Sequence, residues 1–196
     1  MRYELDPTTS RATVHATSSV HPITSSAAVT GWVELTLAPD GSVDLDQPVD
    51  GWICVALAEM RSGNPLVDRE AERRLQVRKH PTMEGRLVSL APAAPDGGHE
   101  HHYDGEGELT FRGQTAPLTG GLSVDVDGDE LTLTGDTTLD VTDYGVQPPS
   151  LLVIKVHSLV RIELRATARA GGEAAPAAAG PGDAAVPDPT APQEHP

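Results

Sequence analysis

The stretch that most constrains the fold is residues 106–141, in which apolar and polar side chains alternate over several consecutive runs. Even spacing puts the apolar residues of a run on one face of an extended chain, the pattern of a strand with one buried face. These positions are Leu109, Phe111, Leu122, Val124, Val126, Leu131, Leu133, Leu139 and Val141. Gly113 and Gly128 stand in the breaks between runs and supply the positive φ that tight hairpins need. The stretch is therefore predicted to be a β-meander.

The rest of the chain is predicted to supply further strands and one helix. Strands are predicted over residues 10–17, 28–37, 82–90 and 156–168, and a run that is apolar on both faces predicts a strand covered on both sides over 51–60. Loops are predicted over 20–26, 91–100 and 143–150. A helix is predicted over residues 64–77, with Asn64 as N-cap and Pro65 at the first helical position. Gly120 and Gly121 lie inside a strand run, where glycine indicates a bulge or a bend. About eight antiparallel strands without βαβ alternation favour a barrel or a sandwich.

Composition narrows the classes of partner. The formal net charge is −15, from 29 acidic against 14 basic residues, which argues against nucleic acid and against an anionic membrane surface. The single cysteine, Cys54, excludes an internal disulfide and a cysteine-based zinc site, and it is expected to be a small buried hydrophobe. Aromatic residues make up only 3% of the chain. Any cavity wall is therefore expected to be aliphatic.

The two ends of the chain carry expectations about domains and location. The first residues hold Glu4 and Asp6 where a signal peptide would begin its apolar core, and no apolar run reaches the ~20 residues of a membrane helix. A cytoplasmic protein that does not span a membrane is expected. Residues 170–196 are rich in Ala, Pro and Gly with scattered acidic residues, which predicts a disordered acidic tail after a domain over residues 1–169.

Three segments carry motifs that indicate a family when they are read together. The first is Tyr3-Glu4-Leu5-Asp6-Pro7, followed by Ser10. The second holds Ser62-Gly63-Asn64, Asp68, Arg69, Leu75 and His80-Pro81-Thr82. The third and most specific reads GELTFRGQTAPL over residues 107–118. Together with Asp143-Tyr144-Gly145 and the last predicted strand, these motifs resemble the YceI-like family of polyisoprenoid-binding β-barrel proteins, over about residues 3–168.

This resemblance implies an all-β fold: a closed, antiparallel, lipocalin-like barrel with one short helical insert. It also implies a non-catalytic protein that holds a polyisoprenoid-class lipid inside the barrel and needs no other cofactor. The side chains expected to line the interior are Val14, Val33, Leu35, Met83, Leu87, Leu109, Phe111, Leu122, Val124, Leu131, Leu133, Leu139, Val160, Ile162 and Leu164. Arg69, Arg73 and Arg74 belong to the main basic cluster of an acidic chain and are candidates to meet a lipid head group at the barrel mouth.

Two other functions stay open at this point. The same apolar side chains can fill a solid core, because periodicity does not distinguish a lined tunnel from a packed one; the protein would then be a stress-response or interaction scaffold. A third hypothesis is a metal-dependent enzyme that uses residues 99–102, whose imidazole and carboxylate groups suit zinc, nickel or copper. A solvated polar loop is the preferred interpretation of that segment, and no metal site is predicted. The oligomeric state stays open.

Overall fold

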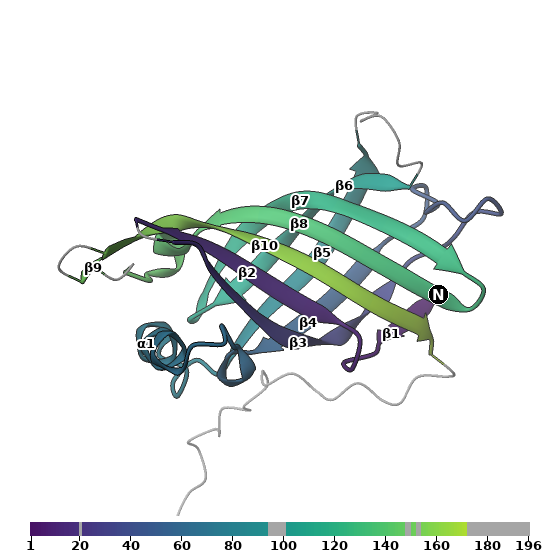
Figure 1. Ribbon diagram of the computed structural model, residues 1–196. Coiled ribbons are helices and arrows are strands. Elements are labelled where there is room, and N and C mark those ends of the chain that lie inside the picture. The colour runs from purple at the N-terminus through teal and green to yellow at the C-terminus, as the bar shows by residue number, and fades with distance from the viewer. Residues whose placement is uncertain (20, 94–100, 148–149, 152–153, 172–196) are drawn as a thin grey trace, which may run out of the picture.

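The structure is a computed structural model that describes residues 1–19, 21–93, 101–147, 150–151 and 154–171. It contains one antiparallel sheet that curls into a barrel (Figure 1). The strands are β1 (Arg2–Leu5), β2 (Arg11–Ser18), β3 (Ile23–Glu34), β4 (Asp50–Ala56), β5 (Thr82–Pro92), β6 (His102–Phe111), β7 (Gln114–Asp127), β8 (Glu130–Asp140), β9 (Ser150–Leu151) and β10 (Ile154–Ala170). The helical elements are the short 3₁₀ turns η1 (Leu57–Glu59) and η2 (Val141–Tyr144) and the helix α1 (Pro65–Leu75).

The barrel closes through β10, the long strand at the end of the domain. From β2 to β8 each strand pairs with its neighbours, and β10 then pairs with both β8 and β2. Its register with β8 runs without a break from Leu159↔Asp140 to Arg169↔Glu130. The prediction of a closed antiparallel barrel is therefore confirmed, and the sandwich alternative is excluded.

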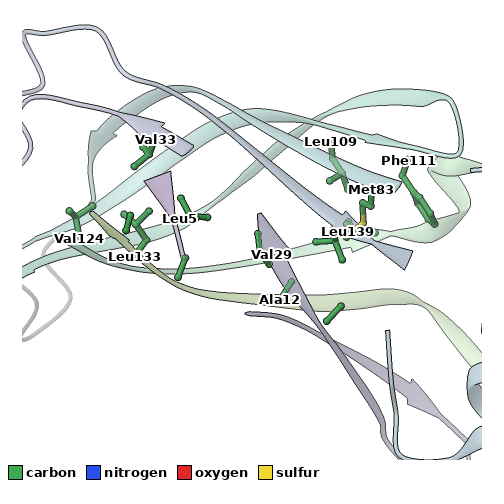
Figure 2. Close-up of a cluster of buried hydrophobic side chains, with 14 of the residues drawn as sticks. Leu5, Ala12, Val29, Val33, Met83, Leu109, Phe111, Val124, Leu133 and Leu139 are labelled. Carbon is green, nitrogen blue, oxygen red and sulfur yellow. The ribbon is translucent and has the colours of Figure 1, made fainter. Parts of the chain in front are cut away.

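Strand alternation sends one face of each strand into a common hydrophobic core. Along β6, Tyr103, Leu109 and Phe111 are buried while Glu106 and Glu108 between them are exposed. Figure 2 shows side chains from well-separated strands pointing into the same interior, among them Leu5, Val29 and Leu139. All fifteen side chains that the sequence assigns to the interior belong to this core or pack against it.

The helix α1 forms where the sequence predicts it, as the one α-helix of the described residues. The Asn64 side chain caps it by accepting a hydrogen bond from the backbone N–H of Leu66 at 3.0 Å, and Pro65 opens the first turn. The helix ends at Leu75, two residues before the predicted end, because its C-cap Gln76 has a left-handed φ of 54°. Leu75 and Val77 pack against the core. In Figure 1, α1 lies at the end of the barrel opposite the β7–β8 hairpin turn. No helix in the described ranges has the length and apolar composition that a membrane crossing requires.

Several predicted strand and loop boundaries are wrong, and the backbone pairing accounts for the first two. The loop predicted over residues 20–26 is strand from Ile23 onward, because the β2–β3 ladder extends to Ala16↔Ile23. The strand predicted over residues 51–60 ends at Ala56, where the backbone N–H of Leu57 bonds to the carbonyl oxygen of Pro81 at 2.9 Å and η1 begins. The strand predicted to end at residue 37 ends at Glu34.

Other boundaries move at both loops that flank the meander. Strand β5 continues to Pro92, two residues into the predicted loop over 91–100. The predicted loop over residues 143–150 is partly the 3₁₀ turn η2, which also takes Val141 out of the last meander strand. The ladder through Gly120 and Gly121 has no register shift, so the predicted bulge is absent there; a shift occurs in β5 between Leu87 and Ser89. Residues 172–196, which make up nearly all of the predicted tail, and His99 with Glu100 lie outside the described residues.

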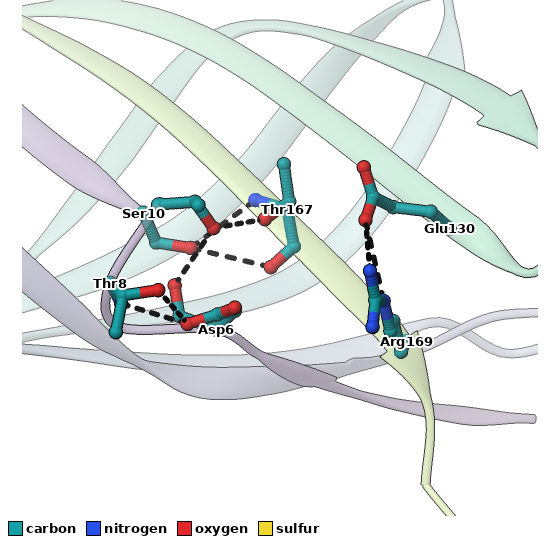
Figure 3. A network of polar contacts seen from close by, with 7 residues as sticks. Asp6, Thr8, Ser10, Glu130, Thr167 and Arg169 are labelled. Atoms are coloured by element: carbon teal, nitrogen blue, oxygen red, sulfur yellow. Dashed lines mark hydrogen bonds and ion pairs between the residues drawn. The ribbon is translucent and has the colours of Figure 1, made fainter.

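A short N-terminal strand completes the wall beyond Arg11, the first residue of β2. Strand β1 pairs with both β10 and β3, and the chain then turns at Asp6 to enter β2. Ser10, which has no exposed surface, accepts a hydrogen bond from the backbone N–H of Thr167 at 3.2 Å and donates one to its carbonyl oxygen at 3.3 Å (Figure 3). Thr8 donates two hydrogen bonds to the Asp6 carboxylate, and these bonds lower the pKa of Asp6. This polar network ties the first turn of the chain to the closing strand.

The substitution Ser10→Ala tests this tie. It leaves the backbone N–H of Thr167 without its acceptor at a buried position, and an unsatisfied buried donor costs ~1–3 kcal/mol. We expect the free energy of unfolding, measured by chemical denaturation, to fall by about that amount. The control is Ser89→Ala, which removes only an exposed hydrogen bond to Glu106 and should change stability by less than about 0.5 kcal/mol. Equal stability of the two variants would contradict the proposed tie.

Candidate functional site: an aliphatic cavity inside the barrel

The barrel contains a cavity of about 200 Å³. Eight of the fifteen predicted interior side chains line this cavity: Val33, Met83, Leu87, Leu109, Leu122, Leu133, Ile162 and Leu164. The other seven lie in the surrounding core: Val14, Leu35, Phe111, Val124, Leu131, Leu139 and Val160. The described part of the barrel is therefore hollow in its middle and packed around it. Contact of these side chains with a ligand stays a prediction.

Aromatic side chains lie beyond the cavity at both ends of β6. Phe111, the last residue of β6, packs against Tyr144 with the ring centroids 5.8 Å apart. Near the start of β6, the Tyr103 hydroxyl accepts a hydrogen bond from the backbone N–H of Val43 at 2.8 Å. Both β6 aromatics are buried, and neither lines the cavity. The cavity is thus bounded along the barrel axis.

Glycines hollow the barrel, and the alternation of apolar side chains does not reveal them. Glycine residues on five consecutive strands, β4 to β8, line the cavity: Gly51, Gly85, Gly105, Gly107, Gly120, Gly121 and Gly135. All except Gly121 stand an even number of residues from a core side chain of the same strand, so they occupy inward positions. The signal was present in the sequence as Met83-x-Gly85-x-Leu87 and Leu118-x-Gly120-x-Leu122. A missing side chain at an inward position leaves space.

The inward glycines differ in whether they could carry a side chain. A Cβ at Gly107 would lie 2.2 Å from the carbonyl oxygen of Arg86, and one at Gly120 would lie 2.4 Å from that of Asp136. Backbone atoms cannot move aside easily, so these two positions require glycine. At Gly105 the nearest atoms to a Cβ would be 3.5 Å away, an ordinary contact distance. A side chain at Gly105 would therefore fit and reduce the cavity.

The ionisable residues that border the cavity direct their side chains outward. Arg86, Glu106, Glu108 and Asp136 are exposed and alternate with inward residues of their strands. Arg86 pairs with Asp50 at 3.3 Å and Asp136 with Arg161 at 3.6 Å, all on the outer surface. These four residues therefore contribute backbone to the wall, and their charges stay in solvent.

The remaining polar and aromatic neighbours of the cavity make contacts of their own. Thr137 lies on the inward face of β8, and its hydroxyl donates a hydrogen bond to the carbonyl oxygen of Thr119 at 2.6 Å. Trp32 and Trp52 occupy outward positions: the guanidinium of Arg2 lies 4.2 Å from the centre of the Trp32 ring, and the Trp52 indole donates to Glu84 at 3.4 Å. The inward surface is therefore aliphatic and glycine-rich, as the low aromatic content suggested. Such a surface can hold an apolar group by burial.

The three candidate head-group residues lie on α1, away from the cavity wall. Arg73 donates two hydrogen bonds to Glu70, at 2.6 and 2.9 Å, and Arg74 donates one at 2.8 Å. These bonds lower the pKa of Glu70 to about 2. Arg69 is exposed, and none of the three arginines lines the cavity. Two of the three cations are thus already paired with a carboxylate of their own helix.

His101, His102 and Cys54 are the described residues of the remaining candidate sites. Among the described residues, no three or more His, Cys, Asp or Glu side chains are grouped to hold a metal ion. His102 hydrogen-bonds to Ser123 at 2.9 Å through Nδ1, and Nδ1 of His101 is buried without a partner. Cys54 is half-buried at an outward position on β4, and burial raises the pKa of its thiol.

Gly105 and Gly107 of β6 together test which positions of the cavity wall can carry a side chain. We expect Gly105→Ala to keep or raise the free energy of unfolding, by up to ~0.4–1 kcal/mol, because the Cβ fits and the unfolded chain loses freedom. Gly107→Ala should lower it by ~1–3 kcal/mol, because its Cβ collides with the backbone of β5. Chemical denaturation of both variants measures the difference. A similar loss for Gly105→Ala would show that its inward side is not free.

The pairing of Glu70 with two arginines has a pH dependence that can be measured. A carboxyl group with a lowered pKa stabilises the fold above its ordinary pKa of 4.5, and this contribution is lost as pH falls through about 2. We therefore expect Glu70→Gln to lower the melting temperature at neutral pH. The difference from the wild type should shrink as the solution is acidified from pH 4.5 to about 2. A difference that stays constant over this range would contradict the pairing.

Comparisons with known proteins agree with this architecture. The model of the YceI-like domain matches residues 3–168. Burkholderia cenocepacia BcnA superposes with a TM-score of 0.66 at 15% identity, covering 83% of this chain and 98% of that chain. A polyisoprenoid binding domain from Saccharophagus degradans, implicated in plant cell wall breakdown, also gives 0.66 at 15% identity, covering 86% and 98%. The Campylobacter jejuni YCEI protein gives 0.54 at 10% identity, covering 74% and 82%.

No curated protein sequence is significantly similar to the chain. The structural likenesses are all at low sequence identity, so they establish a shared fold. The family model extends over nearly the whole described barrel, from β1 to the end of β10. The chain belongs to the YceI-like domain family.

Proposed function

We propose that this protein binds an apolar, lipid-like ligand of the polyisoprenoid class inside its barrel and catalyses no reaction on it. The observation that carries the proposal is the cavity of about 200 Å³ whose inward surface is formed by aliphatic side chains and glycine backbone. Burial of an apolar chain against such a surface contributes about 25 cal/mol per Å² before ordering costs. The ligand class is that of the Saccharophagus degradans domain, which shares the fold.

Two features of the cavity support binding rather than chemistry. Its ionisable neighbours direct their side chains to the outer surface, so no acid, base or nucleophile among them is directed at an enclosed ligand. The only inward polar group described above, the Thr137 hydroxyl, already donates its hydrogen bond to a backbone carbonyl. An apolar chain in this space would meet surface that matches it and no reactive group.

The proposal is tested by loading the purified protein with farnesol and measuring the complex by native mass spectrometry. Gly105→Val places a side chain in the cavity, so we expect at least a tenfold loss of farnesol binding. Asp104→Val is the matched control, because it adds the same side chain at the neighbouring exposed position and should bind like the wild type. Organic extraction of the untreated protein should also release a prenyl lipid.

Other results would favour the competing functions. A wild-type protein that binds no isoprenoid of any length would exclude the proposed function and leave the scaffold hypothesis. Equal binding by wild type and Gly105→Val would place the ligand outside the barrel. An enzymatic activity that is lost on chelation, and in a His99→Ala, His101→Ala double variant, would support the metal-dependent alternative instead.

A further inference from the structure

The cavity is short along the barrel axis, and this limits what can occupy it. On β6 the cavity extends from Gly105 to Leu109 and stops at Tyr103 and Phe111, the next inward positions on either side. Four steps along a strand span about 13 Å at a rise of ~3.3 Å per residue. Strand β8 repeats the pattern, because Leu133, Gly135 and Thr137 line the cavity while Leu131 and Leu139, the next inward positions, do not. The same boundary therefore appears on two separate strands.

Bonded contacts hold both boundaries in place. The Tyr103 hydroxyl accepts a hydrogen bond from the backbone N–H of Val43, which is itself buried in the core. At the other end, Phe111 packs on Tyr144, and the Arg112 guanidinium donates to the carbonyl oxygens of Tyr144 and Gly145. Lengthening the cavity would require these contacts to break. The volume of about 200 Å³ also lies below the ~300–1,000 Å³ of typical drug-sized ligand sites.

The charges around the cavity disfavour an anionic ligand. Three residues that border it, Glu106, Glu108 and Asp136, carry carboxylates on the outer surface, against the one bordering cation, Arg86. Arg86 is paired with Asp50 and Asp136 with Arg161, so the carboxylates of this group still outnumber its cations. The cations Arg73 and Arg74 of α1 are bound to Glu70. Like charges near a binding site weaken an anionic ligand. A diphosphate or carboxylate head group that reached the outer surface here would meet net negative charge.

We propose that the cavity selects a short, uncharged isoprenoid of about the length of farnesol, in preference to long-chain polyprenols and to prenyl diphosphates. This inference rests on the proposed function and narrows it. The chain length is set by the distance between Tyr103 and Phe111, and the width by the inward glycines. Neutral head groups are preferred because the carboxylates bordering the cavity outnumber its cations.

The test compares four probes with the wild-type protein at one ionic strength, by native mass spectrometry and by competition. We expect farnesol to bind at least tenfold more tightly than solanesol, a long-chain polyprenol, and than farnesyl diphosphate. Equal or tighter binding of solanesol would overturn the length limit, and equal or tighter binding of farnesyl diphosphate would overturn the charge preference. In both cases the proposed function stands. Preference for the straight-chain alcohol tetradecanol over farnesol would overturn the isoprenoid class itself.

Two variants test the boundaries directly. Phe111→Ala removes one boundary and should reduce the preference for farnesol over solanesol at least threefold, whereas Thr110→Ala, at the exposed position before it, should keep the wild-type preference. Gly105→Val shortens the space from within and should shift the preference from farnesol toward geraniol, which keeps the inference testable if Phe111→Ala does not fold. An unchanged chain-length preference in Gly105→Val would overturn the inference.

Discussion

The double pairing of β10 is the constraint on which the rest of the structure depends. By bonding to β8 along one side and to β2 and β1 along the other, this strand removes the free edges that an open sheet would expose. Closure also gives the alternation of apolar and polar residues its structural effect, because every inward residue then faces the same interior. The buried tie between Ser10 and Thr167 lies at this junction and fixes the position where the N-terminal strands meet β10. The core, the cavity and its boundaries all follow from this one closure.

The cavity arises from a balance between glycines and large side chains on the same inward faces. On β6, Tyr103, Leu109 and Phe111 fill space, while Gly105 and Gly107 between them leave it empty. The chain achieves a hollow interior with very few aromatic residues, and it uses two of them to close the ends rather than to line the wall. The YceI-like barrel of this chain therefore holds a cavity whose dimensions follow from these inward residues.

The sequence predicted those features that depend on side chains with a strong preference for burial or for a turn. Alternation in residues 106–141 identified three consecutive strands and their hairpins, and Asn64 with Pro65 located the start of α1. The prediction failed where backbone pairing, and not side-chain type, determines the secondary structure. Ser25 and Ser26 are polar, yet they form part of β3 because β2 pairs with them. The glycines of the wall were missed for a similar reason. A pattern of apolar side chains does not identify glycine positions, which shape the wall because they have no side chain.

The position of β10 in the chain has a consequence for how the protein is made. The strand that closes the barrel is the last one described, and its partners β1 and β2 are the first two in the element order. Contacts between such distant segments are slow to form because a long loop must be ordered first. Until β10 leaves the ribosome, β8 and β2 present unpaired edges and the apolar interior is open to water. The apolar interior of the nascent domain is therefore covered late, and the cavity exists only once β10 has been made.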